Sequence, residues 1–231
     1  MGKLILVRHG KSLWNVENIF TGWTDIDLAP QGVEEAKKAG ALLKKNNIHI
    51  DICFSSFLKR AIRTNWIMLD TADMMHIDCI YSWRLNERHY GAWQGWNKDE
   101  VKKEVGEEIF WKMRRGYDTP PPVLTSDDKR HPKFDTKYNR LDPSLLPVSE
   151  SLKDTRKRAV EYFFECIAPQ LVKGSTVMVT AHGNSIRALM AQIEDIPATE
   201  VSKIEIPTGD PYVYEFDDNL NLKEHYPLKQ R

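Results

Sequence analysis

Two histidine–glycine pairs are the first candidates for chemistry in this sequence. His9 and Gly10 follow the aliphatic run 4–7, and His182 and Gly183 follow the run 176–180. An imidazole can accept a phosphoryl group when one nitrogen is free and the other is held by a hydrogen bond, and a following glycine lets the backbone approach a phosphate. Each histidine alone also fits a capping or packing role. Their matched placement predicts that both converge on one site, with His9 as the nucleophile.

Two arginines could stabilise the charge of a phosphoryl transfer at this site. Such transfers depend on charge stabilisation more than on covalent chemistry, so planar guanidinium groups around the reacting oxygens are the expected accompaniment. Arg8 directly precedes His9, and Arg60 follows the second aliphatic run, 50–54. An arginine after a strand is often a solvated surface residue, and the sequence leaves that alternative open for Arg60.

The segment 83–91 concentrates aromatic, acidic and basic side chains directly after a short apolar run, 77–81. A carboxyl group that faces an anionic substrate can donate and accept protons, which suits Glu87 to general acid and base work. The alternative for Glu87 is a surface salt bridge with Arg84 or Arg88.

Three further cations lie farther along the chain on a charged helical stretch. Lys98 is near its beginning, and Arg114 and Arg115 are at its end. The paired arginines could clamp a second anionic group from above. They could equally form a solvated helix face, as runs of charge usually do.

The elements that must position these residues alternate between strand and helix. Apolar runs typical of strands lie at 4–7, 50–54, 77–81, 176–180 and 212–216, and helical patterns lie at 31–45, 59–70, 97–115, 151–171 and from 184 onward. This order predicts an α/β fold: a single domain, residues 1–231, with a three-layer α/β/α arrangement and a mainly parallel central sheet. In such a sheet, ligands bind outside the carboxyl ends of the strands, where both histidines should fall.

Residues from about 97 to 150 differ from the rest of the chain. After the charged helical stretch come three consecutive prolines, 120–122, and then Pro132, Pro143 and Pro147 in a polar segment without strong periodicity. Such a segment does not form core elements. We therefore expect a long insertion that acts as a lid over the active site.

Composition excludes several classes of function. The 33 basic and 33 acidic side chains cancel, so no global field favours nucleic acid or a membrane surface. Cys53, Cys79 and Cys166 are far apart and form no CxxC pair or clustered His/Cys ligand set. Widely spaced cysteines, together with an N-terminal apolar run too short for a signal segment, predict a cytoplasmic protein.

Several segments together resemble a known family. Residues 6–15 (Leu-Val-Arg-His-Gly-Lys-Ser-Leu-Trp-Asn) look like the signature of the cofactor-dependent phosphoglycerate mutases, in the histidine phosphatase superfamily. Similar matches follow in order at 20–23, 58–61, 83–91, 114–118, 150–155 and 181–185, so the resemblance covers nearly the whole chain. The Arg-His-Gly triplet alone indicates only the superfamily, whereas segment 83–91 and the three prolines resemble the mutase branch.

The resemblance implies a role for each matched residue. His9 would be phosphorylated, Glu87 would donate and accept the proton, and His182 would assist beside Arg8 and Arg60. Positions that would contact the phosphates or the carboxylate of the substrate are Arg8, Gly10, Lys11, Ser12, Asn15, Thr21, Gly22, Arg60, Glu87, Arg88, His89, Tyr90, Lys98, Arg114, Arg115, Gly183 and Asn184. Lys11 stands where this family commonly has glutamate or glutamine, and it adds a positive charge two residues from His9.

The activity implied by the resemblance is the interconversion of 3-phosphoglycerate and 2-phosphoglycerate, a step of glycolysis and gluconeogenesis. In the implied mechanism, 2,3-bisphosphoglycerate phosphorylates His9 without a metal, and the enzyme is a homodimer. Two alternatives stay open. A histidine-type phosphatase or a bisphosphoglycerate mutase/phosphatase could use the same residues, and a non-catalytic scaffold could retain the fold.

Overall fold

A six-stranded sheet forms the centre of the molecule. The structure, a computed structural model, describes residues 1–229. The strands are β1 (Lys3–Arg8), β2 (Ile52–Ser55), β3 (Cys79–Tyr81), β4 (Thr176–Ala181), β5 (Pro211–Phe216) and β6 (Leu222–Pro227). They lie in the order β3-β2-β4-β1-β5-β6, with parallel pairing from β3 to β1 and antiparallel pairing of β5 with both β1 and β6. The predicted mainly parallel sheet is confirmed, and β6 is an addition that the sequence pattern did not indicate.

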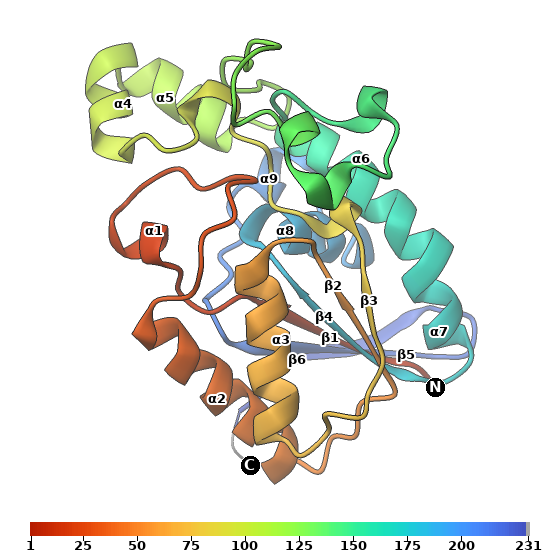
Figure 1. Cartoon of the computed structure of the whole chain (residues 1–231). Helices are drawn as coiled ribbons and strands as arrows, with labels where there is room; N and C mark the ends of the chain where they lie inside the picture. Colours follow the sequence, from red (N-terminus) through yellow and green to blue (C-terminus); the bar gives the residue numbers. More distant parts are fainter. Residues whose placement is uncertain (230–231) are drawn as a thin grey trace.

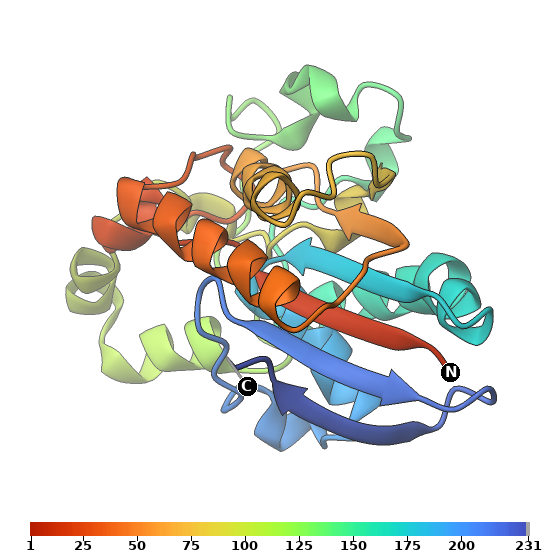
Figure 2. The ribbon, with the colours of Figure 1, turned by 90° about the horizontal axis from the view of Figure 1, so that it is seen from below.

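Helices cover both faces of this sheet, as Figures 1 and 2 show. Helices α2 (Pro30–Lys45) and α3 (Lys59–Thr71) lie on one face, and α6 (Leu152–Tyr162), α7 (Ala168–Val172) and α8 (Gly183–Ile193) lie on the other. Successive strand side chains point to opposite faces. Leu4 and Leu6 of β1 therefore join the core under α6 to α8, while Ile5 and Val7 join the core under α2 and α3. Burial on both faces explains why the run is continuously aliphatic.

The helix predicted for residues 151–171 is interrupted. A π-helical turn, η6 (Phe163–Ile167), separates α6 from α7. Pro169 follows this turn, and a proline inside a helix has no N–H to donate and its ring clashes with the carbonyl four residues earlier. A locally wider turn relieves that clash.

The segment from 97 to 150 lies above the carboxyl ends of the strands, at the top of Figure 1. The helical stretch predicted there is divided into two helices, α4 (Lys98–Val105) and α5 (Glu107–Arg115). Gly106 lies between them with a positive φ of 81°, which ends α4. Short turns follow: η3 (Pro132–Phe134), η4 (Thr136–Tyr138) and η5 (Pro143–Leu145). Phe20, Trp93 and Phe110 form a small separate core under α4 and α5.

The remaining elements are short. They are α1 (Leu13–Val16), α9 (Ala198–Val201) and the 3-10 turns η1 (Trp83–Leu85) and η2 (Gly91–Trp93). Within the described residues, no helix has the length and apolar character needed to cross a membrane.

Candidate active site

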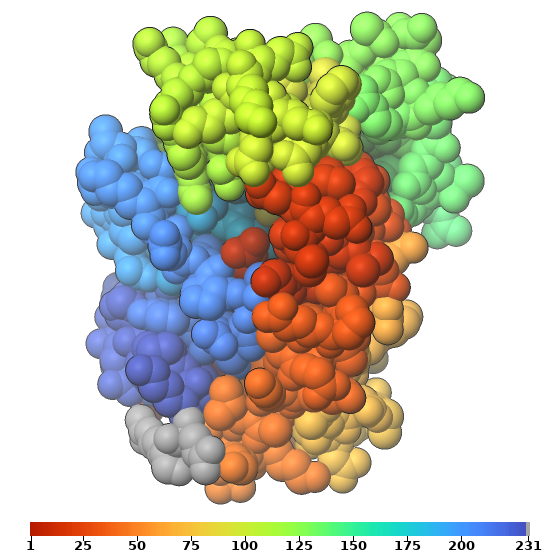
Figure 3. All heavy atoms as spheres, turned by 90° about the vertical axis from the view of Figure 1, so that its left-hand side faces the viewer, coloured from red at the N-terminus to blue at the C-terminus, as the bar shows by residue number. Residues whose placement is uncertain are grey.

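A pocket of about 140 Å³ opens at the carboxyl ends of β1 and β4. Figure 3 shows it as a hollow between the N-terminal segment, the segment that includes α4 and α5, and the C-terminal part of the chain. It is lined by Arg8, His9, Asn15, Ile19, Phe20, Thr21, Gly22, Arg60, Glu87, Tyr90, Lys98, Arg114, Arg115, Gly183, Asn184 and Arg187. Six of these carry an arginine or lysine cation and one carries a carboxylate, so the pocket fits an anionic ligand.

The two predicted histidines meet because their strands are neighbours. β1 and β4 pair in parallel with Arg8 opposite Ala181, and the His9 N–H donates to the Ala181 carbonyl at 2.9 Å. The ring centroids of His9 and His182 are 5.0 Å apart. Adjacent parallel strands that end together therefore bring residues 173 positions apart in the sequence into contact.

His9 is prepared as a nucleophile by its surroundings. Its Nδ1 lies 2.6 Å from the carbonyl oxygen of Gly10, which can only accept, so Nδ1 carries the hydrogen and Nε2 carries the lone pair. Burial lowers the pKa of His9 well below its ordinary value, and the charges of Arg60 and Arg8 lower it further. The ring is thus neutral at physiological pH, and its Nε2 lone pair, which accepts from Arg60 Nε at 3.3 Å, is the available nucleophile.

Gly10 itself is required by close packing. A Cβ at this position would lie 2.2 Å from the carbonyl oxygen of Gly32. The Gly10 N–H donates to Thr64 Oγ1 at 3.0 Å, which fixes the backbone just after His9.

His182 lies behind His9 and is fully buried. Its Nε2 is 2.7 Å from Ser56 Oγ, and burial followed by the charge of Arg60 lowers its pKa well below the ordinary value. Its Nδ1 has no hydrogen-bond partner among the described residues, and the same holds for two other buried atoms, Arg8 Nε and Thr21 Oγ1. Arg8 and Thr21 line the pocket, so their unpartnered atoms are available to a ligand there.

Arg60 is fixed by main-chain acceptors. It donates from Nη2 to Gly22 O at 2.8 Å and from Nη1 to Thr24 O at 3.0 Å, while its Nε approaches His9 Nε2 at 3.3 Å. It is 1% exposed, and burial lowers its pKa to about 10, so it stays charged at neutral pH. Arg60 is therefore not a solvated surface residue.

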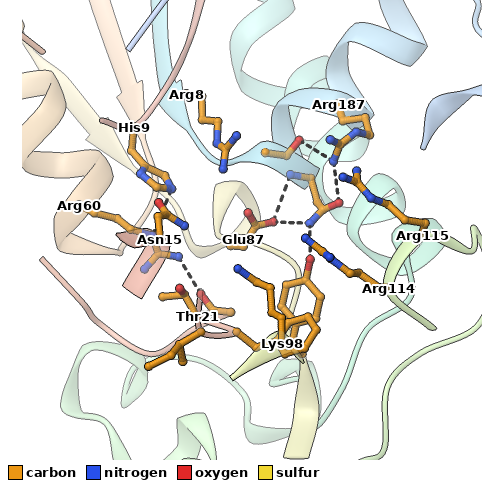
Figure 4. Close-up of a pocket in the computed structure, with 16 residues that line it drawn as sticks. Arg8, His9, Asn15, Thr21, Arg60, Glu87, Lys98, Arg114, Arg115 and Arg187 are labelled. Atoms are coloured by element: carbon orange, nitrogen blue, oxygen red, sulfur yellow. Dashed lines mark hydrogen bonds between the residues drawn. The ribbon is translucent and has the colours of Figure 1, made fainter. Parts of the chain in front are cut away.

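Glu87 lies at the centre of the pocket, as Figure 4 shows. Its Oε1 accepts three hydrogen bonds, from Arg88 N at 2.8 Å, Asn184 N at 3.1 Å and Asn184 Nδ2 at 2.8 Å. Asn184 Nδ2 also donates to Tyr90 Oη at 3.1 Å. Because Glu87 is 9% exposed and held by these donors, it does not form the surface salt bridge considered above.

A buried ion pair supports the backbone of Glu87. Arg158 pairs with Glu150 at 2.6 Å, and Arg158 Nη2 also donates to the Glu87 carbonyl at 2.9 Å. Trp23 Nε1 donates to the same carbonyl at 2.6 Å. Two side-chain donors thus fix the carbonyl of Glu87.

The cations of the segment above the sheet also face the pocket. Lys98 at the beginning of α4 and Arg114 and Arg115 at the end of α5 line it. Burial and then the neighbouring Arg114 charge lower the pKa of Lys98 to about 8, and burial lowers the pKa of Arg114. These residues are not just a solvated helix face.

Some residues expected at the site do not line the pocket. They are Gly10, Lys11, Ser12, Arg88, His89 and His182. The Ser12 side chain caps α1 by accepting from the Asn15 N–H, and the Lys11 N–H donates to Glu35. Arg88 is 1% exposed and donates to the carbonyls of Met113 and Arg114, so it holds the end of α5 instead of pointing at a ligand.

Three lining residues were not selected from the sequence: Ile19, Phe20 and Arg187. Arg187 is 8% exposed and lies in the otherwise apolar run of α8. A single arginine in a helix that is buried on most sides was the available signal. Burial and then the charge of Arg115 lower its pKa to about 10.

Within residues 1–229, no group of three or more His, Cys, Asp or Glu side chains could hold a metal ion. Positive charge at the pocket is supplied instead by the arginines and Lys98.

A neutral histidine at the end of the first parallel strand, a second histidine against it and arginines around both define a phosphohistidine-type site. The chain belongs to the histidine phosphatase superfamily, branch 1, whose family model matches residues 4–130 and 124–226.

Within that superfamily, the chain is similar to proteins named 2,3-bisphosphoglycerate-dependent phosphoglycerate mutase. It is 57% identical to the one from Nautilia profundicola over 228 residues, which cover 99% of this chain and 100% of that protein. It is 49% identical to the one from Staphylococcus carnosus, over 98% of this chain and 100% of that protein.

Solved structures with lower sequence identity share the fold. A putative alpha-ribazole-5'-P phosphatase from Escherichia coli has a TM-score of 0.74 at 16% identity, covering 100% of this chain and 98% of that one. A mycobacterial glucosyl-3-phosphoglycerate phosphatase has a TM-score of 0.71 at 21% identity, covering 98% and 97%.

Proposed function

We propose that this protein is a phosphoglycerate mutase that interconverts 3-phosphoglycerate and 2-phosphoglycerate through a phosphohistidine at His9, primed by 2,3-bisphosphoglycerate. The observation that carries this proposal is the neutral His9 Nε2, facing a cation-lined pocket that also contains Glu87. The full-length similarity to named mutases supports the mutase activity over other reactions of the superfamily.

The pocket fits a ligand with two phosphates and a carboxylate. Arg8, Arg60 and Asn15 surround His9 on one side, and Lys98, Arg114 and Arg115 approach from the other (Figure 4). The unpartnered Thr21 Oγ1 and Arg8 Nε supply free donors at the same place. We assign the reacting phosphate to the His9 side and the remaining anionic groups to the cations of α4 and α5.

In the first half-reaction, His9 Nε2 attacks a phosphorus atom of 2,3-bisphosphoglycerate. The N–P bond forms, the P–O bond to the glycerate breaks, and Glu87 gives its proton to the leaving oxygen. Arg60 Nε–H, which approaches His9 Nε2, can then donate to an oxygen of the transferred group. His182, whose ring centroid lies 5.0 Å from that of His9, supports the position of the His9 ring during the transfer.

In the second half-reaction, the free hydroxyl of 3-phosphoglycerate attacks the phosphorus on His9, and Glu87 takes the hydroxyl proton. The bisphosphate reorients and returns its other phosphoryl group to His9, leaving 2-phosphoglycerate. The protein cations stabilise the developing charge, so the mechanism requires no metal.

A phosphatase is the second candidate, since water can replace the acceptor hydroxyl on the phosphohistidine.

We propose that segment 97–150 acts as a lid within one domain, 1–231. Its helices carry three of the pocket cations, so anion binding would draw it over the site and exclude water. This favours transfer over hydrolysis.

We further propose a homodimer in the cytoplasm, with no nucleic-acid partner. The edge strand β3 exposes Ile80 and Tyr81. Trp66 of α3 lies beside them, and its Nε1 donates to Tyr81 Oη. These three side chains form an apolar edge suited to contact with a second copy of the chain.

The proposed cytoplasmic location is supported by the cysteines. Those at 53, 79 and 166 are free, as expected in a reducing compartment.

The decisive experiment is conversion of 3-phosphoglycerate to 2-phosphoglycerate in excess EDTA, with and without 2,3-bisphosphoglycerate, with released phosphate measured in parallel. Turnover that depends on the bisphosphate, persists in the chelator and disappears in His9→Ala would support the mutase. Phosphate release without isomerisation would instead identify a phosphatase. A protein without either activity, and without acid-labile phosphorylation of His9, would be a scaffold.

A further inference from the structure

We propose that Arg187 is a positioning residue that fixes the side chain of Asn184 and thereby makes Oε2 the oxygen of Glu87 that exchanges the proton. This inference rests on the proposed function, in which Glu87 is the general acid and base. It adds a residue and an atom that neither the sequence motifs nor the family resemblance indicates.

The two carboxylate oxygens of Glu87 have different surroundings. Oε1 accepts three N–H donors, all between 2.8 and 3.1 Å. Oε2 accepts no hydrogen bond from the described residues. An oxygen that already accepts three hydrogen bonds has no lone pair available for a proton, whereas Oε2 does. The proton of the acid form therefore belongs on Oε2.

Two of the three donors to Oε1 are main-chain N–H groups, and the third depends on how the carboxamide of Asn184 is turned. Its Nδ2 donates to Glu87 Oε1 at 2.8 Å, and its Oδ1 accepts from Arg187 Nη1, also at 2.8 Å. A guanidinium can only donate and a carboxylate can only accept. Rotating the carboxamide by half a turn would place NH₂ against the guanidinium and C=O against the carboxylate. Arg187 therefore excludes the turned conformer on chemical grounds.

Arg187 is itself anchored well enough to serve this purpose. Its Nε donates to the carbonyl of Ile204 at 2.9 Å, and its Nη1 also reaches the carbonyl of Gly183 at 3.2 Å. The side chain is 8% exposed. A series of hydrogen bonds therefore runs from Arg187 through Asn184 to Glu87, and Figure 4 labels its two ends, Arg187 and Glu87.

For the reaction this arrangement has a specific consequence. During phosphorylation of His9, the Oε2–H bond breaks and the proton passes to the oxygen that leaves phosphorus. Without Arg187, Asn184 Oδ1 loses its donor, so the bond from Asn184 Nδ2 to Glu87 Oε1 and the orientation of Oε2 are less firmly fixed. The steps that need proton transfer should therefore slow more than the attack by Nε2 on a donor whose leaving group needs no proton.

The test compares two phosphoryl donors in single-turnover phosphorylation of His9. The leaving group of 2,3-bisphosphoglycerate is an alkoxide that needs a proton, whereas that of 2,4-dinitrophenyl phosphate is a stable phenolate that does not. We expect Arg187→Met to slow the first reaction roughly 10- to 100-fold more than the second, whatever loss of phosphate binding the two reactions share. Arg187→Lys keeps a donor for Asn184 Oδ1. Its ratio of the rate with 2,3-bisphosphoglycerate to the rate with 2,4-dinitrophenyl phosphate should therefore lie between those of the parent protein and Arg187→Met.

The ratio of the two rates is insensitive to partial unfolding, because inactive molecules lower both rates equally. Glu87→Gln serves as the positive control and should show the same dependence on the leaving group. Equal loss with both donors in Arg187→Met would mean that Arg187 binds phosphate or merely supports the fold, and no loss would mean that it has no role; either result overturns the inference. If Glu87→Gln also lacks the dependence, the proton-transfer role of Glu87 in the proposed function fails with it.

Discussion

At the scale of single residues, the site depends on keeping His9 neutral among positive charges. Burial and the neighbouring Arg60 and Arg8 all lower its pKa, so the unprotonated ring predominates at physiological pH. The Gly10 carbonyl then selects the tautomer with the lone pair on Nε2. In the proposed mechanism, the arginines that bind the phosphate thus also keep the nucleophile neutral.

Lys98 should give the reaction an upper pH limit. Its pKa is lowered to about 8 by burial and by Arg114, so Lys98 is charged below that pH and loses its proton above it. A bound anion favours the charged form, so KM for 3-phosphoglycerate should rise by roughly tenfold between about pH 7 and pH 9, since one pH unit above the pKa leaves about a tenth of the group charged. Initial-rate measurements across this range check the prediction.

The control for this measurement is a matched pair of substitutions in α4. Lys98→Arg keeps a charge throughout the range and should flatten the rise. Lys102→Arg changes an exposed lysine that pairs with Glu107 and should leave the rise unchanged. If Lys98→Arg keeps the full pH dependence, another group is responsible.

The contrast between predicted and observed site residues has a geometric cause. Neighbours in an extended or irregular segment point in different directions, so a contiguous motif cannot place every side chain in one pocket. This is why Lys11 and Arg88 turn away while Arg8, His9 and Glu87 line the pocket. Arg187 reaches the site from inside a helix, where no local motif marks it.

At the scale of elements, the position of α5 determines whether Arg114 and Arg115 face the pocket. Arg88 donates to the last carbonyls of this helix, at Met113 and Arg114, and also to Thr119 and Glu150. A helix leaves its final carbonyls without internal partners, and here one buried guanidinium satisfies two of them. Arg88 therefore connects the loop of Glu87 to the segment that carries the paired arginines.

Arg88→Met should loosen this segment. Several buried carbonyls would lose their donor at about 1–3 kcal/mol each, so we expect a lower melting temperature, faster amide exchange in residues 107–119 and a higher KM. Exchange followed by mass spectrometry checks the local effect. Arg84→Met, which removes a partly exposed salt bridge to Glu165, is the control and should change exchange little. Unaltered exchange in 107–119 of Arg88→Met would contradict the assignment.

Element boundaries also show what the sequence could not reveal. The inner strands were predictable because burial on both faces demands continuous aliphatic residues, whereas β6 has mostly exposed side chains and no such pattern. The division of 97–115 into α4 and α5 depends on one glycine, and the π-helical turn before α7 depends on one proline. Single residues of this kind do not alter the overall periodicity.

At the scale of the whole molecule, β3 leaves one edge of the sheet open. Ile80, Tyr81 and Trp66 on and beside this edge are 44%, 37% and 58% exposed, which is costly for large apolar side chains unless another surface covers them. The opposite edge, β6, carries mostly polar residues. This difference is why the β3 edge is the expected dimer contact.

Ile80→Lys should therefore shift the protein from dimer to monomer in sedimentation velocity experiments, because it places a charge in the centre of that contact. Val123→Lys changes an equally apolar but more exposed residue, 62%, in the segment above the active site, and should leave the mass unchanged. A dimer that survives Ile80→Lys would place the contact elsewhere, and a monomeric parent protein would rule it out.

The concentration of charge at the pocket has a consequence for how ligands reach it. The chain has 33 basic and 33 acidic residues, yet six cations and one carboxylate line this single pocket. The compensating acidic groups lie outside this lining, so the mouth of the active site is a locally positive region of a molecule without net charge. Its field directs multiply charged phosphates toward His9 over distances of about the Debye length, roughly 8 Å at physiological salt. If His9 is the nucleophile, as proposed, polyanions are thereby concentrated at the reacting group of a protein with no net charge.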